Sequence, residues 1–293
     1  MKTISGSYPK NFKEVDFSVK VPEDWTELEK YQFARIIEVL HFTKADKYTI
    51  SVSLLALLFG PENYPLLRNL SEVKAMEPDD PSGDELLHML TPLTNFIFET
   101  KPPVKNFFPY IQLKKKKHIA PADDLSNLSF GEWCFAHQYY IYYSITKDKE
   151  WLIKLIATIY RPVNPLQNPE SANYNGDQRE AFNENLIEKR ALSVADLENH
   201  IQLGIMAWFS VALAEVSLAR PHVFPPAPDV DPENPQPVEE MEPDTSRTWL
   251  TIFRELLGPK WGTEQQLKFT NAMFVLDELE DKHIAFEEAK KQN

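Results

Sequence analysis

The fold of this chain is best predicted from residues 128–162, which read LSFGEWCFAHQYYIYYSITKDKEWLIKLIATIYRP. Ser129 is followed three residues later by Glu132, which is the spacing of a capping box at the start of a helix. Asp148 is a second helix-start signal, and the apolar residues that follow it recur at helical spacing. Pro162 marks the end of the second helix, because the residue before a proline disfavours the helical conformation. The stretch therefore predicts two consecutive helices at the centre of the chain.

Aromatic residues follow the first of these helices at helical spacing, including Trp133, Tyr139 and Tyr143. Such stripes belong to cores and interfaces more often than to ligand cages, so we interpret them as core or protein-binding residues. Cys134 in the same helix is predicted to be a small buried filler rather than a nucleophile. His137 is predicted to be a hydrogen-bonded, half-buried residue.

Helical signals continue toward the N-terminus. Thr26 and Glu29 have capping-box spacing before a predicted helix, and a nearly all-apolar helix is predicted at 46–59. A further helix is predicted after Asp84. Residues 1–22 are polar and mixed and predict an N-terminal arm, in which FSVKV (17–21) alternates as a strand does.

The segment 101–120 is rich in proline and has one strand-like run, so it predicts a small extended or β element and a possible sub-boundary at 101–128. Lys114 to Lys117 are interpreted as a solvated strand end rather than a nucleic-acid site. Beyond the central stretch, helices are predicted at 177–190 and 194–219, the second capped by Ser193.

Residues 225–245 form a predicted linker, because its proline and carboxylate residues cannot build a core. A helical hairpin is predicted at 246–293. Its stripe Trp249, Phe253 and Leu257 either packs onto the body or docks a partner helix. The fold class is therefore mainly all-α, with a helical body at 23–224 and a tethered C-terminal hairpin.

Composition narrows the possible partners. The formal net charge is −13 and the sequence pI is about 5.1, which disfavours binding to nucleic acid and to anionic membranes. The chain has one cysteine and no signal-peptide pattern at its N-terminus, and its apolar stretches are interrupted by polar residues. We expect a cytoplasmic protein that does not insert into membranes.

Catalytic motifs are absent from the sequence: it has no phosphate-binding glycine loop and no nucleophile elbow, and we expect no cofactor. The one constellation with metal-binding precedent is Glu-x-x-His, which helical di-metal carboxylate proteins use in pairs. It suggests a di-metal enzyme as an alternative, although solvated helix faces produce the same spacing. The three occurrences are Glu38/His41, Glu85/His88 and Glu280/His283.

Residues 128–162 resemble a pattern in helical proteins of tailed-phage and prophage tail gene clusters, in which an "FGE" helix start, a "TKD" turn and a "YRP" helix end occur in order. Three flanking stretches are similar to the same family: VPEDWTELEKYQFARIIEVL (21–40), NGDQREAFNENLIEKRAL (175–192) and TWLTIFRELLGPKWGTEQQ (248–266). The resemblance implies an accessory or structural protein of tail morphogenesis, and it carries over no catalytic residue.

The resulting hypothesis is a non-enzymatic protein-binding factor, most simply a tail assembly chaperone that holds a tape-measure-like helical client. The alternative within the same pathway is a structural tail or baseplate component of the virion. The candidate contact residues are Trp133, Tyr139, Tyr143, Trp249, Phe253 and Leu257.

Overall fold

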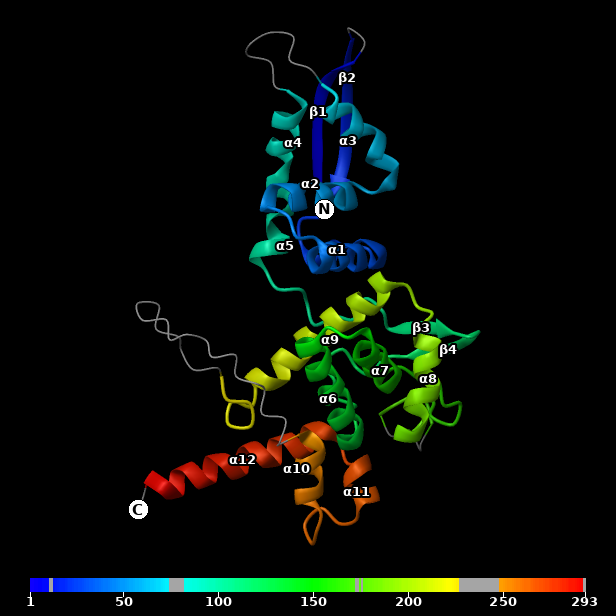
Figure 1. Ribbon diagram of the computed structural model, residues 1–293, viewed down its shortest axis with the longest axis vertical. Helices are drawn as coiled ribbons and strands as arrows, with labels where there is room; N and C mark the ends of the chain where they lie inside the picture. Colours follow the sequence, from blue (N-terminus) through cyan, green and yellow to red (C-terminus); the bar gives the residue numbers. More distant parts are fainter. Residues whose placement is uncertain (11–12, 74–81, 172–173, 175, 227–247, 292–293) are drawn as a thin grey trace. The chain divides into compact units, whose positions relative to one another are not determined.

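The structure is a computed structural model of residues 1–293, and it describes all of them except 11–12, 74–81, 172–173, 175, 227–247 and 292–293. The described chain is mainly helical and carries two small antiparallel sheets, which confirms the predicted fold class in outline. It divides into two compact units (Figure 1). One contains Met1–Phe108 and Glu198–Val211, and the other contains Pro109–Leu197 and Ala212–Asn293.

The first unit begins with a β-hairpin where the sequence predicts a polar arm. Strands β1 (Lys2–Lys10) and β2 (Lys13–Val21) pair antiparallel along their full length. Tyr8, Val19 and Val21 are buried, while most other side chains of the hairpin are exposed. The strand-like alternation predicted at 17–21 is confirmed as part of β2, and the polar arm takes the form of a hairpin with one solvated face.

Helices complete the first unit, and several begin or end at residues other than the predicted ones. Asp24 caps a short 3-10 turn, and the true capping box of α1 is formed by Glu29 and Gln32. Ser82, rather than Asp84, caps α4. The bounds are α1 Lys30–Phe42, α2 Lys47–Phe59, α3 Tyr64–Ser71, α4 Gly83–Leu90 and α5 Asn95–Glu99. The helix predicted at 46–59 is confirmed as α2.

The second unit is built around α6 (Phe130–Thr146), which contacts α7 (Lys149–Ile159), α10 (Trp249–Leu256), α11 (Glu264–Phe269) and α12 (Ala272–Lys291). The two central helices are therefore confirmed. A small sheet is formed by β3 (Tyr110–Leu113), β4 (Lys116–Ile119) and β5 (Arg161–Pro162) in the order β3-β4-β5. It confirms the predicted β element, and Lys114 and Lys115 make its turn with positive φ angles of 44° and 67°.

The helices predicted at 177–190 and 194–219 are displaced. The chain from Asp177 to Asn183 is not helical, because two of its side chains join a buried ion network described below. Helix α8 spans Ile187–Val194 and contains Ser193, so Ser193 is not a cap. Helix α9 spans Asn199–Leu218 and contributes residues to both compact units.

Helix α9 is long and apolar enough to cross a bilayer by length and composition, despite its internal glycine and glutamate. Half of its most apolar window is buried inside the protein, as in the core helix of a soluble domain. Length and composition alone therefore do not identify it as a membrane span.

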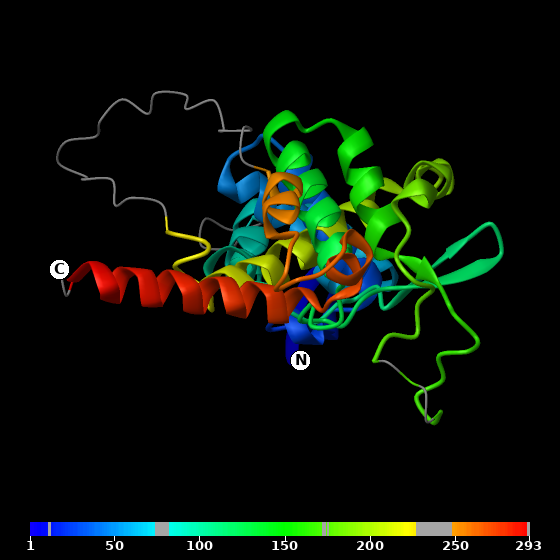
Figure 2. The ribbon, with the colours of Figure 1, turned by 90° about the horizontal axis from the view of Figure 1, so that it is seen from below.

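The C-terminal segment forms three helices instead of a hairpin, and they belong to the same unit as α6. The N–H of Phe130 donates to the Thr270 carbonyl at 2.7 Å, and that of Ala272 donates to the Leu128 carbonyl at 2.8 Å. Figures 1 and 2 show α12 running outward from α6, and its residues 281–291 are almost all exposed. The predicted linker, 225–245, falls almost entirely on 227–247, outside the described residues.

Candidate functional site

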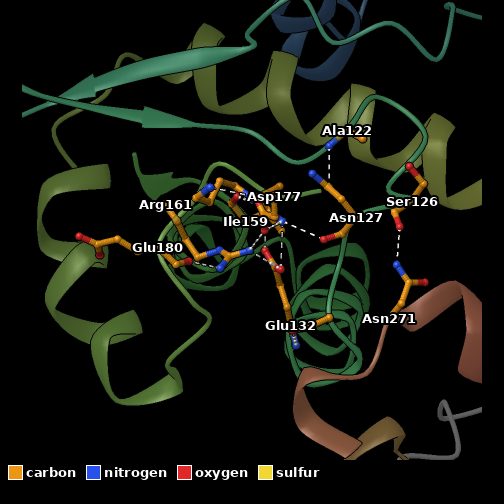
Figure 3. A network of polar contacts seen from close by, with 11 residues as sticks. Ala122, Ser126, Asn127, Glu132, Ile159, Arg161, Asp177, Glu180 and Asn271 are labelled. Carbon is orange, nitrogen blue, oxygen red and sulfur yellow. Dashed lines mark hydrogen bonds and ion pairs between the residues drawn. The ribbon is translucent and has the colours of Figure 1, made fainter. Parts of the chain in front are cut away.

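A buried network of ionised side chains lies at the start of α6 (Figure 3). Glu132 accepts hydrogen bonds from Arg161 Nη2 and Arg179 Nη1, each at 2.8 Å. Asp177 accepts from Arg161 Nη2 at 2.9 Å and from Arg179 Nε at 2.8 Å. The side chains of Glu132 and Arg179 are both 0% exposed. Two guanidinium groups and two carboxylates therefore balance one another inside the unit.

Local structure places each member of this network. Ser129 caps α6 by accepting from the backbone N–H of Glu132, which confirms one half of the predicted capping box. The other half is wrong, because the Glu132 carboxylate turns into the core toward the two arginines. Arg161 enters from β5 at the end of α7, and Arg179 also donates to the Ile159 carbonyl at 2.9 Å.

The network sets the charge state of its carboxylates. Burial raises the pKa of Glu132, and the charges of Arg161 and Arg179 oppose that rise. Burial acts in the same direction on Asp177, but the hydrogen bonds and charge of Arg179 keep the pKa of Asp177 below its ordinary value. Removing either arginine would therefore leave a desolvated carboxylate without its main compensation.

A polar cavity of about 620 Å³ adjoins the network. Arg161, Asp177 and Arg179 form part of its wall, together with Asn127 and Asn164. The apolar residues Leu128, Ala181, Phe182 and Phe269 close other parts of the wall. A volume of this size lies in the range of small-molecule and peptide-binding cavities.

A cleft of about 310 Å³, lined by both apolar and charged residues, lies between α6, α10 and α11 in the same unit. It is called the apolar cleft below after its phenylalanine and leucine side chains. Its lining includes Cys134, Phe135 and Phe182 on one side and Phe253 and Leu257 on the α10 side. Charged residues stand at its edge: Lys268 forms an ion pair with Glu184, and Arg254 and Glu264 are exposed. This combination of an apolar floor and a charged rim is the usual anatomy of a protein-binding cleft.

The structure divides the predicted protein-binding residues into two groups. Trp133, Tyr143 and Trp249 are only 0%, 4% and 8% exposed, so they are core residues in this fold. Trp249 packs edge-on against Phe130 and Trp133, with ring centroids 6.1 Å apart in both pairs. The intramolecular packing of the α10 stripe is thus observed.

The second group reaches the surface. Tyr139 and Phe253 are half-buried and Leu257 is 39% exposed. Phe253 stacks on Phe130 with ring centroids 5.7 Å apart and still lines the apolar cleft. Binding of a partner by these residues stays a prediction, and Leu257 is the best placed of them.

The first Glu-x-x-His pair, Glu38 and His41, lies on α1, where each side chain has a local partner. Glu38 forms an ion pair with Arg35, with Arg35 Nη1 2.6 Å from Glu38 Oε2. The ring of His41 lies edge-on to that of Phe42, with centroids 4.8 Å apart. Both side chains are half-buried on their own helix. Glu38 and His41 therefore each have a neighbour on α1 as a partner.

The second pair, Glu85 and His88, lies on α4. The Glu85 side chain completes the capping box with Ser82, which holds the carboxylate at the start of the helix. The ring of His88 is exposed and lies 5.6 Å from that of Tyr48 between centroids. The carboxylate and the imidazole of this pair thus have different partners.

The third pair, Glu280 and His283, lies on α12. Glu280 accepts from His222 Nδ1 at 2.6 Å, while His283 is exposed. Across the described ranges, no three His, Cys, Asp or Glu side chains come together in a group that could hold a metal ion. The convergence of these pairs that a di-metal centre requires is therefore not found among the described residues.

Cys134 and His137 both lie on α6. Cys134 is 0% exposed and burial raises the pKa of its thiol, which agrees with the predicted filler role. Burial lowers the pKa of His137 to about 4. Its ring contacts Trp133, Phe224 and Trp249, and within the described part of the chain its side chain has no hydrogen-bond partner, contrary to the prediction.

The ion network was not predicted from the sequence. The available signal was a set of charged residues in segments without helical periodicity, since Arg161 follows α7 and both Asp177 and Arg179 precede α8. Nothing in their spacing connects them with Glu132, because contacts of this kind depend on the tertiary fold.

Comparisons with known proteins add no identification. No family model matches this chain, and neither a curated protein nor a solved structure matches it. The resemblance to phage-tail proteins therefore stays a prediction.

Proposed function

We propose that this protein is a non-enzymatic binding factor that holds a helical partner in the apolar cleft between α6, α10 and α11. The observation that carries the proposal is the cleft itself, with Phe135, Phe253 and Leu257 in its lining and charged side chains at its edge. An amphipathic helix binds such a groove by inserting apolar side chains spaced three or four residues apart.

The size of the cleft suits one or two inserted side chains. Full burial of a leucine or phenylalanine contributes about 1.5–3 kcal/mol, so a few anchors make a reversible complex of moderate affinity. Leu257 and Phe269, on either side of the Gly258–Gly262 turn, are 39% and 48% exposed and extend the apolar surface beyond the cleft. Reversible binding is what a factor that releases its client requires.

The sequence resemblance suggests the client. It implies a role in phage or prophage tail morphogenesis, in which a tape-measure-like helical chain would occupy the cleft before the tail tube forms. The acidic balance of the chain, with a net charge of −13, favours solubility while the client is held. A permanent virion component would differ by being present in purified particles.

The proposal is tested by measuring the affinity of the purified protein for the longest helical protein of its own gene cluster. Leu257→Asp is expected to weaken binding at least tenfold, because it places a charge against the apolar side chains of the partner. Leu192→Asp is the matched control, since Leu192 is 71% exposed on α8 and does not line the cleft. Equal affinities for both variants and the parent protein would contradict the proposal.

A further inference from the structure

The polar cavity beside the ion network presents hydrogen-bond donors that the protein leaves unused. The side-chain oxygens of Asn127 and Asn164 accept from the backbone N–H groups of Ala122 and Leu166. Their Nδ2 amide groups have no partner among the described residues.

The acceptors in the same wall are already occupied. Asp177 Oδ1 accepts from the backbone N–H and the Nε of Arg179, at 2.9 and 2.8 Å. Its Oδ2 accepts from Arg161 and Arg179, each at 2.9 Å. The cavity therefore offers donors to a ligand and few acceptors, so the complementary ligand carries oxygen acceptors.

The charges in the cavity wall favour a ligand whose hydrogen-bond acceptors are neutral. The four ionised groups of the network have a formal sum of zero, two positive and two negative. The side chain of Asp177 is 18% exposed, whereas those of Arg161 and Arg179 are 3% and 0% exposed. The Asp177 carboxylate, which lies at the surface of the network, would therefore repel an anionic ligand. It would not repel the amide carbonyl oxygens of a neutral ligand, because they carry no net charge.

We propose that this cavity binds an extended peptide segment through its main-chain carbonyl oxygens, with an apolar side chain against Phe182 and Phe269. Asn127 Nδ2 and Asn164 Nδ2 are the donors to those carbonyls. Phe269 is 48% exposed and gives the cavity a contact for an aromatic or aliphatic side chain. The ligand of this cavity is an extended segment and that of the cleft is a helix, although Phe182 lines both sites.

The test is an NMR titration of protein labelled with ¹⁵N at asparagine, using two matched probes. N-acetyl-phenylalanine methylamide offers two neutral carbonyls and an aromatic ring, and N-acetyl-phenylalanine replaces one amide by a carboxylate. The methylamide is expected to shift the side-chain amide signals of Asn127 and Asn164 in a saturable manner. The free acid is expected to bind more weakly.

Asn164→Asp is the decisive variant, because it keeps the oxygen that accepts from Leu166 and removes the Nδ2 donor. It is expected to weaken binding of the methylamide at least fivefold, whereas Asn185→Asp, an exposed position outside the cavity, leaves it unchanged. Absence of any saturable shift, tighter binding of the free acid, or full binding by Asn164→Asp would each overturn the inference. Leu257→Asp is expected to leave these shifts intact, which separates this site from the apolar cleft.

Discussion

Glu132 and Arg179 form a fully buried ion pair, with Glu132 Oε1 2.8 Å from Arg179 Nη1, although the two residues are 47 positions apart in the sequence. This contact joins the first turn of α6 to the chain that precedes α8. The ion pair fixes one wall of the polar cavity, which Arg179 lines. It also positions Phe182, three residues beyond Arg179, and Phe182 lines both the cavity and the apolar cleft. The ion pair therefore supports both candidate sites.

Glu132→Gln is expected to lower the free energy of unfolding by about 3–5 kcal/mol, because it leaves Arg161 and Arg179 buried with one carboxylate between them. Urea denaturation followed by circular dichroism measures the loss. Glu150→Gln is the control, because Glu150 is 60% exposed in its ion pair with Lys154. This substitution is expected to lower the free energy of unfolding by less than about 1 kcal/mol. A similar small loss for both variants would show that the network contributes little.

The sequence predicts the local elements of this fold better than its long-range contacts. The caps at Ser129 and Asp148 follow short-range rules, and the structure contains both. The same rules misassign Glu132, because capping-box spacing does not reveal an arginine 47 residues away. The N-terminal hairpin is predicted only in part: the alternation in residues 17–21 indicates β2, whereas β1 was not predicted.

The candidate sites could be predicted only in part for the same reason. Phe253 and Leu257 stand out in the sequence as an apolar stripe, and both line the cleft. Phe182 and Lys268 form the rest of the cleft wall, and nothing in the sequence around them indicates that they lie near that stripe. The stripe thus identified one wall, while the opposite wall depends on tertiary packing.

Trp249→Ala is expected to cost about 3–5 kcal/mol of stability, because Trp249 is 8% exposed and packs against Phe130, Trp133, His137 and Phe224. Thermal unfolding should show a lower Tm for this variant than for Leu166→Ala, whose parent side chain is 80% exposed. Unchanged stability of Trp249→Ala would mean that α10 does not pack on α6 in solution.

His137 is expected to make the protein less stable in acid. Burial lowers the pKa of His137 from 6.5 to about 4, so the unfolded state binds the proton more tightly than the folded state does. Stability is therefore full above pH 6.5 and is lost as the pH falls toward 4, by up to about 1.4 kcal/mol per pH unit for one proton.

The measurement for His137 is urea unfolding at several pH values for the parent protein and His137→Gln. Burial also lowers the pKa values of His118 and His200, so both proteins should lose stability in acid. The contribution of His137 is the difference between the two slopes. Parallel pH dependences would show that His137 titrates alike in the folded and unfolded states.

Site-specific photo-crosslinking from the rim of the apolar cleft tests whether a helical partner binds there. A benzophenone amino acid is placed at Leu257, or at Leu192 as the control, and the protein is irradiated with the long helical protein of its gene cluster. The account predicts a crosslink from position 257 to apolar residues spaced three or four apart in the client, and none from position 192. Equal crosslinking from both positions, or none from position 257, would contradict the account.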